Sequence, residues 1–196
     1  KIDGGHYSSL KIEQFDSEII PIKHGEIISI YIPLYEKGEN PVIIAYSNSS
    51  IYEYNALIRH ELFEDISQIQ VNDKVLIAKN NYKYGVLNGE FGKVIEMSPQ
   101  TEEIPITLKK KEGSATLKLK FRDVTIETTD LDNEPITIQG KIIENILKSK
   151  KSNLSKDETR ALYVNFLMRN QAFKPGSPDF KAALRTDPYF NALQIK

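Results

Sequence analysis

The sequence contains no cysteine. This absence excludes a disulfide scaffold, a thiolate metal site and a cysteine nucleophile. No apolar run approaches the roughly 20 residues of a membrane span, and no apolar h-region follows the first residues. We therefore expect a cytoplasmic globular protein without a membrane partner. Its 196 residues suit one domain, or a domain that carries an inserted module.

Catalytic motifs are also scarce. The stretch Gly85–Lys93 resembles a phosphate-binding loop, but it lacks the leading glycine at the required spacing, and Val94 replaces the serine or threonine that would hold magnesium. His60 and Glu61 begin like a zinc-protease helix, but the second histidine is missing. We expect no catalytic residue, no metal site and no cofactor in this chain.

The net charge of −1 hides a regional pattern. Residues 1–40 carry seven carboxylates against four lysines, whereas residues 71–122 carry nine lysines and Arg122 against six acids. Residues 123–134 are acidic again. A basic stretch inside a neutral protein fits either a polyanion partner or a solvated surface, and charge alone leaves both interpretations open.

The segment after residue 40 predicts half of a βαβ unit. Val42–Tyr46 is a short apolar run typical of a buried parallel strand. Ser50 and Glu53 form a capping box that opens a helix to about Phe63. Residues 1–38 stay unassigned, since their apolar run at 27–32 fits a strand while 25–36 also fits a helix.

From residue 70 the hydrophobic period changes to two, and six short strands are expected, at 73–79, 91–96, 104–110, 115–121, 124–128 and 136–138. In the fourth, Leu117, Leu119 and Phe121 alternate with Lys118, Lys120 and Arg122, which predicts one apolar and one cationic face. The pattern indicates a small β-barrel of SH3-like or OB-like type. Afterwards, Ser155 and Glu158 form a second capping box that begins a helix to about Phe173, and a short helix follows at 179–184.

Between the first two of these strands, Lys79–Tyr84 interleaves lysines, asparagines and tyrosines. Such mixtures bind single-stranded nucleic acid, because cations follow the phosphates and aromatic rings stack on bases. The alternative is that the tyrosines pack on the rim of the barrel itself.

Three segments, in this order, resemble the RecD-like branch of superfamily 1B DNA helicases. Val42–Asn48 with Asn55–Arg59 is similar to helicase motif IV, Val71–Val94 to the start of an inserted SH3-like module, and Asp187–Leu193 to the approach to motif V. The resemblance implies an α+β fragment in which a partial RecA-like α/β unit, residues 39–69 and 186–196, is interrupted by an SH3-like β-barrel at 70–140. A helical segment at 141–185 would return to the RecA-like part, and the stretches 40–63 and 186–196 would complete one sheet.

The resemblance also implies a function. The parent protein would be an ATP-dependent DNA helicase, a hydrolase that uses ATP and magnesium, moves 5′ to 3′ along single-stranded DNA and serves DNA repair or recombination. Its Walker motifs would lie outside this chain, so the fragment alone would be inactive. Its partners would be single-stranded DNA and the remaining helicase domains of the parent chain.

The candidate site residues fall into two groups. The candidates for DNA contact are Ser47, Asn48, Lys79, Asn80, Lys83, Tyr84, Lys118 and Lys120. Asn55 and Arg59, one helical turn apart, are candidates for the interdomain and nucleotide cleft. The alternative is a stand-alone SH3- or OB-like interaction module without enzymatic activity, in which carboxylates of residues 123–134 neutralise the lysine face.

Overall fold

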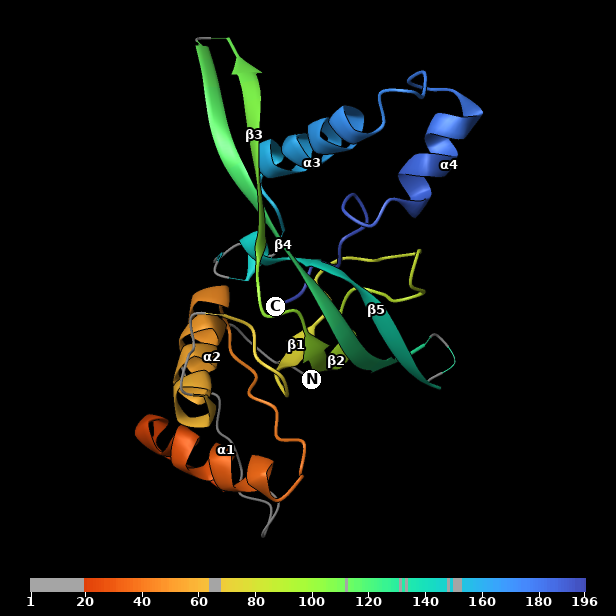
Figure 1. Cartoon of the computed structure of the whole chain (residues 1–196). Helices are drawn as coiled ribbons and strands as arrows, with labels where there is room; N and C mark the ends of the chain where they lie inside the picture. The colour runs from red at the N-terminus through yellow and green to blue at the C-terminus, as the bar shows by residue number, and fades with distance from the viewer. Residues whose placement is uncertain are drawn as a thin grey trace, which may run out of the picture.

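The computed structural model describes residues 20–63, 68–111, 113–130, 132, 134–147, 149 and 153–196. Residues 1–19, half of the unassigned N-terminal segment, lie outside the described residues. The structure combines a five-stranded antiparallel sheet with two groups of helices, one N-terminal and one C-terminal, at opposite ends of the molecule (Figure 1). The expected mixed α+β class is confirmed.

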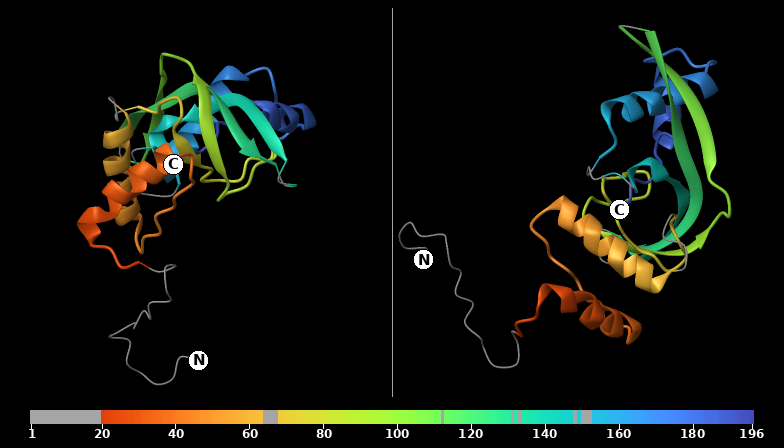
Figure 2. Two further views of the ribbon diagram at one scale, coloured as in Figure 1. Left: turned by 90° about the horizontal axis from the view of Figure 1, so that it is seen from below. Right: turned by 90° about the vertical axis from the view of Figure 1, so that its left-hand side faces the viewer.

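The strands are β1 (Lys74–Leu76), β2 (Phe91–Met97), β3 (Glu102–Lys110), β4 (Gly113–Thr129) and β5 (Pro135–Ile143). Their order is β1-β2-β4-β3, and β5 also pairs with β4. The single long strand β4 replaces the two strands expected at 115–121 and 124–128, because Arg122 and Asp123 stay in the ladder opposite Ile142 and Lys141. Its first half forms a projecting hairpin with β3, and its second half pairs with β2 and β5 (Figures 1 and 2).

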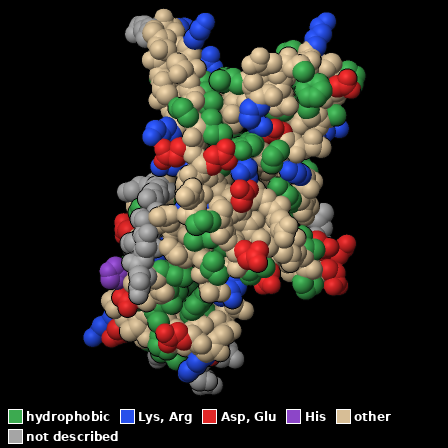
Figure 3. Space-filling view, in the orientation of Figure 1, with side chains coloured by type: hydrophobic (Ala, Val, Ile, Leu, Met, Phe, Trp, Pro, Cys, Tyr) green, Lys and Arg blue, Asp and Glu red, His purple; other side chains and the backbone are tan. Residues whose placement is uncertain are grey.

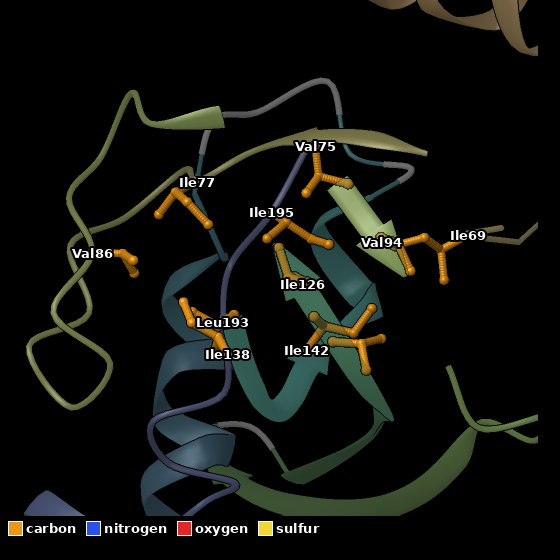
Figure 4. Packing of buried hydrophobic residues seen from close by; sticks show 11 residues of the cluster. Ile69, Val75, Ile77, Val86, Val94, Ile126, Ile138, Ile142, Leu193 and Ile195 are labelled. Atoms are coloured by element: carbon orange, nitrogen blue, oxygen red, sulfur yellow. The ribbon is translucent and has the colours of Figure 1, made fainter. Parts of the chain in front are cut away.

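The C-terminal segment, residues 191–196, lies between β1 and β5. The backbone N–H of Leu76 donates to the carbonyl of Lys196 over 2.7 Å, and that of Ile143 donates to the carbonyl of Leu193 over 3.0 Å. Leu193 and Ile195 are fully buried. They pack in one core with residues of the sheet, as Figure 4 shows: Ile69, Val75, Ile77, Val86, Val94, Val124, Ile126, Ile138 and Ile142.

Placing the C-terminal segment here corrects one expectation. Residues 186–196 were expected to share a sheet with residues 40–63, and this is wrong for the described chain, since 191–196 pair with β1 and β5 instead. The physical reason is apolar burial: Leu193 and Ile195 fill the space that the short strand β1 leaves open.

Two helices follow the sheet. Helix α3 (Lys156–Arg169) begins at the predicted capping box of Ser155 and Glu158, which is confirmed, and α4 (Pro178–Thr186) matches the expected short helix. Helix α3 ends before the predicted Phe173, because the side-chain amide of Asn170 caps the carbonyl of Phe166 over 2.9 Å. At the start of the expected helical segment 141–185, the chain forms only one 3-10 turn, η2 (Glu144–Ile146), because β5 extends through Ile143.

A second core lies where α3 packs on the hairpin. Ile106, Leu108, Leu119, Phe121 and Ile143 from the sheet meet Ala161 and Leu162 from the helix and Ala192 from the C-terminal segment. One face of the hairpin root is therefore fixed by apolar contacts with α3, and the hairpin tip extends past them.

The N-terminal part is helical. It comprises η1 (His24–Glu26), α1 (Ile27–Glu36) and α2 (Asn48–Leu62), and it resolves the open choice at 25–36 in favour of a helix. Helix α2 begins earlier than expected, because Ser47 rather than Ser50 is its N-cap: the Ser47 hydroxyl accepts the N–H of Ser50 over 3.1 Å. Neither α1 nor α2 has a buried residue.

The expected buried strand Val42–Tyr46 is wrong. The segment lies outside every strand of the described chain, and the side chains of Val42, Ile44 and Tyr46 are 69, 93 and 97% exposed. A strand needs a neighbouring strand to hydrogen-bond with its backbone N–H and C=O groups, and no described segment pairs with this one. Among the helices of the described residues, none has both the length and the apolar character required to cross a membrane.

Candidate nucleic-acid interface

The loop between β1 and β2, residues 77–90, is held by its own backbone and by the C-terminal segment. Asn81 and Val86 exchange backbone hydrogen bonds of 2.8 and 3.2 Å. The buried side chain of Asn81 donates to the carbonyl of Asn191 over 2.8 Å. Asn88 and Gly89, a dipeptide typical of hairpin turns, form a turn in which Gly89 has a φ of 101°, a conformation that favours glycine. The loop is thus a fixed platform.

The candidate Asn80 braces this platform. Its side-chain oxygen accepts the backbone N–H of Asn88 over 2.8 Å, and its amide donates to the hydroxyl of Tyr82 over 3.2 Å. Asn80 therefore links both arms of the loop and orients the Tyr82 ring. Its side chain is engaged within the loop, so Asn80 would contribute to binding by positioning Tyr82 rather than by direct contact with a ligand.

The side chains of the loop that are available to contact a ligand are those of Lys79, Tyr82 and Lys83. Both lysines are exposed, and no carboxylate of the described residues forms an ion pair with either. Tyr82 is 82% exposed, so its ring face is open to a stacking partner. Tyr82 belongs to the predicted stretch but was not among the candidates, since spacing alone does not tell which tyrosine points outward.

Tyr84, which was a candidate, is half-buried against the core. Its ring lies on Gly140 of β5, where an added Cβ would come within 2.3 Å of the Tyr84 hydroxyl. Lys83 places its Nζ 4.9 Å from the ring centroid on the remaining side. For Tyr84, the structure agrees with the alternative interpretation: the ring packs on the rim of the sheet.

Beyond the loop, β2 adds two exposed side chains that sequence reasoning missed. Phe91 is 64% exposed, and Lys93 shares its face of the strand, while Gly92 and Val94 point inward. The alternation along β2 was the signal that identifies them. Lys93 has Glu127 opposite it in the ladder, so its charge is partly balanced.

Lys118 and Lys120 are engaged with a carboxylate. Their ammonium groups lie 2.8 and 2.9 Å from the two carboxylate oxygens of Glu103 on β3. Hydrogen bonds from Lys118 and Lys120 lower the pKa of Glu103 to about 2, and the same contact raises the pKa of Lys120. Glu103 thus balances one of the two charges of this cationic face on its own hairpin, and the continuation of the face, Arg122, is buried.

Ser47 and Asn48 lie at the start of α2. The Ser47 hydroxyl is occupied as the N-cap, whereas Asn48 is exposed in the first turn of the helix. They follow an extended segment that belongs to no strand of the described residues, so they do not lie at the carboxyl end of a sheet strand, where open α/β sheets bind ligands.

Asn55 and Arg59 differ in their surroundings. Asn55 is exposed, whereas the guanidinium of Arg59 forms an ion pair with the buried Asp73 and donates to the carbonyl of Gln68. Burial raises the pKa of Asp73, and the hydrogen bond from the Gln70 N–H and the charge of Arg59 only partly oppose this. Arg59 therefore fastens α2 to the segment that leads into β1.

No metal centre emerges from the part of the chain that the structure covers, where no three histidine, aspartate or glutamate side chains gather as ligands. An open hollow of about 720 Å³ over β2, β4 and β5 is lined by Glu96, Asp123 and Gln139 among others, and it offers neither an aromatic platform nor a free cation. The β1–β2 loop is the stronger site.

No family model matches this chain, and no curated protein matches it.

Proposed function

We propose that this chain is part of an ATP-dependent DNA helicase of the RecD-like branch, in which it grips single-stranded DNA. ATP and magnesium would be bound by the parent protein outside this chain. Within the chain, the β1–β2 loop would hold the strand through Tyr82, Lys79 and Lys83.

The exposed Tyr82 ring on its braced loop is the observation that carries the proposal. A base stacked on an aromatic side chain contributes about 1–3 kcal/mol, and it does so for any base. Lys79 and Lys83 flank the ring in sequence and are free to meet phosphates. Because Asn80 and Asn81 fix the loop before binding, little ordering entropy opposes the contact.

The finer fold assignment rests on two features. The sheet and the C-terminal segment together surround one core, which supports an SH3-like barrel. The exposed Val42, Ile44 and Tyr46 form an apolar, unpaired segment, which supports a further sheet in the parent protein that this segment would join. The sheet that residues 40–63 and 186–196 were expected to share is not formed by the described residues, so it does not support the RecA-like assignment.

The test is fluorescence anisotropy of a labelled oligothymidine with this chain at two salt concentrations. Binding should be measurable at low salt and fall steeply with added salt, because phosphate contacts release counterions. Tyr82→Ala should weaken binding about tenfold, as expected for one lost stack. The matched control Tyr52→Ala, on α2, should leave it unchanged. Absence of binding at low salt, or equal losses in both variants, contradicts the proposal.

A second candidate is a stand-alone module that binds protein. It is favoured by one observation: the lysines of this face already pair with acidic side chains, Lys118 and Lys120 with Glu103, and Lys141 with Asp123 and Glu102. Only Asp123 comes from the segment expected to supply these charges. The protein-binding candidate is supported if the oligonucleotide fails to bind and the parent protein shows no DNA-stimulated ATP hydrolysis.

A further inference from the structure

The tip of the β3–β4 hairpin and the α3–α4 region carry the excess positive charge of the molecule. We call residues 107–116 and 153–186 the cationic end. It contains nine lysines and arginines against four carboxylates, although the whole chain has a net charge of −1. Figure 3 shows Lys and Arg side chains at the ends of both projecting arms, with one acidic side chain near the end of the right-hand arm and most of the others lower on this face.

The two arms of the cationic end are fixed to one another. Lys110 near the hairpin tip forms a 2.8 Å ion pair with Asp157 in the first turn of α3. Below it, Leu108 of β3 and Leu162 of α3 share the second core. Helix α4 is joined to α3 by the edge-on contact of Phe166 and Phe180, whose centroids lie 5.3 Å apart. Cations on all three elements are therefore presented on one rigid frame.

Most of these cations lack a local partner. Among the described residues, Lys110 and Arg169 form ion pairs, with Asp157 and Asp187, and the pKa of Asp157 is lowered mainly by Lys110 and to a smaller extent by the charge of Arg160. No carboxylate of the described residues pairs with the others, which are Lys109, Lys111, Lys156, Arg160, Lys174, Lys181 and Arg185. This sets the cationic end apart from the lysine face of β4, where both Lys118 and Lys120 form an ion pair with Glu103.

Their spacing follows the helices. Lys156 and Arg160 are one turn apart on α3, and Lys181 and Arg185 are one turn apart on α4, so each pair lies on one side of its helix. The 14 residues of α3 span about 21 Å. One strand of a duplex places a phosphate every 3.4 Å or so along its axis, so about six phosphates fall within that length.

The exposure of its aromatic rings indicates whether the cationic end suits single-stranded or double-stranded nucleic acid. The largest exposed rings of the cationic end are Tyr163 and Phe173, at 39 and 37%, and Tyr163 already packs edge-on against Phe180 and Phe190. No ring in its described part is as free as Tyr82. Cations without stacking platforms suit a partner whose phosphates are outside and whose bases are hidden.

We propose that the cationic end binds the phosphate backbone of double-stranded nucleic acid, as a surface separate from the β1–β2 loop. With the proposed function, this would give the chain one site for the duplex and one for the single strand of a junction. The duplex site itself rests on the charges of the cationic end and stands even if the loop binds no single strand.

The experiment measures binding of a labelled blunt duplex and of the oligothymidine to the full 196-residue chain, with anionic lipid vesicles as a third probe. The tip variant is Lys109→Glu/Lys111→Glu, and the arm variant is Arg160→Glu/Arg185→Glu. The matched control, Lys23→Glu/Lys37→Glu, makes the same change of charge around α1. Circular dichroism and thermal melting establish that each variant is folded.

We expect both the tip and the arm variant to weaken duplex binding roughly tenfold and to reduce the slope of log K against log salt by about 1–2. Oligothymidine binding should change less than duplex binding, and the control should bind both DNAs like the original chain. An equal loss in the control, no loss in either variant, or binding of vesicles but not of duplex would overturn the proposal. Duplex binding without oligothymidine binding would instead remove the proposed function alone.

Discussion

Arg122 and Glu144 form an ion pair inside the protein, with the Arg122 Nε 2.6 Å from a Glu144 carboxylate oxygen and the Arg122 side chain only 1% exposed. The guanidinium also donates to the carbonyl of Ser98 and to the side chains of Gln68 and Thr101, over 3.0, 2.5 and 2.6 Å. One cation thus ties the β2–β3 turn and the approach to β1 to the end of β5.

Removing the anion from this pair should be costly. Glu144→Ala leaves the buried guanidinium without its counter-charge, and we expect a loss of about 3–5 kcal/mol in the free energy of unfolding. Glu144→Gln keeps an acceptor and should lose less. Urea unfolding followed by circular dichroism measures both. An unchanged midpoint for Glu144→Ala would mean that the pair contributes little to stability.

The pair of Arg169 and Asp187 predicts a pH dependence. Burial opposes ionisation of Asp187, but hydrogen bonds from Arg169 and from the N–H groups of Phe190 and Tyr189 outweigh it and lower the pKa below the ordinary 3.8. In the interval between these two pKa values the unfolded chain binds more protons than the folded one, so stability rises with pH there. The contribution is complete above the ordinary value and is lost as pH falls through the folded one.

Asp187→Asn should therefore destabilise the protein by about 1–3 kcal/mol near neutral pH, as for a lost charged hydrogen bond. The difference between the variant and the original chain should shrink as the pH is lowered below 4 or so. Thermal melts across an acid series measure this. The exposed Asp179→Asn on α4 is the control, and a pH-independent difference for Asp187→Asn would refute the assignment.

Local pattern predicted the strands where both partners are near in sequence. The alternation of Leu117 and Leu119 with lysines identified β4, because a period of two is a property of the segment itself. Val42–Tyr46 has an equally strong apolar pattern and yet forms no strand here. Pairing depends on a neighbour, and the sequence of one segment does not contain that information.

The site shows the same limit. Lys79–Tyr84 was identified from composition, but the outward ring is Tyr82, since Gly140 in a distant strand makes room for Tyr84. Arg122 continued the cationic pattern of β4 and is buried, because its partners Gln68, Ser98 and Glu144 come from three separate segments. Long-range contacts decide such positions.

Glu103 should titrate far below an ordinary glutamate. Hydrogen bonds from Lys118 and Lys120 lower its pKa to about 2 from 4.5. The carboxyl carbon shift of Glu103, followed by NMR from neutral to acid pH, should report this value, and added salt should raise it, since the pair is exposed to solvent. The replacement Lys118→Gln/Lys120→Gln should return the pKa towards 4.5. A salt-insensitive, ordinary pKa in the original chain would show that the ion pairs do not persist in solution.

Gly140 and Tyr84 should behave as a coupled pair. A Cβ at position 140 would lie 2.3 Å from the Tyr84 hydroxyl and 2.7 Å from its ring carbon Cζ, so Gly140→Ala displaces the ring that covers the core. We expect a loss of about 1–3 kcal/mol in the free energy of unfolding, typical of overpacking. Tyr84→Leu removes the clashing atoms, so the double variant should be more stable than the sum of the single effects, by about 0.5–3 kcal/mol. Urea unfolding of the four proteins measures this, with Gly25→Ala, where no atom lies within 4 Å, as the control. Strict additivity would show that Tyr84 does not rest on Gly140, and Tyr84 would then regain its place beside Tyr82 as a ring available to DNA.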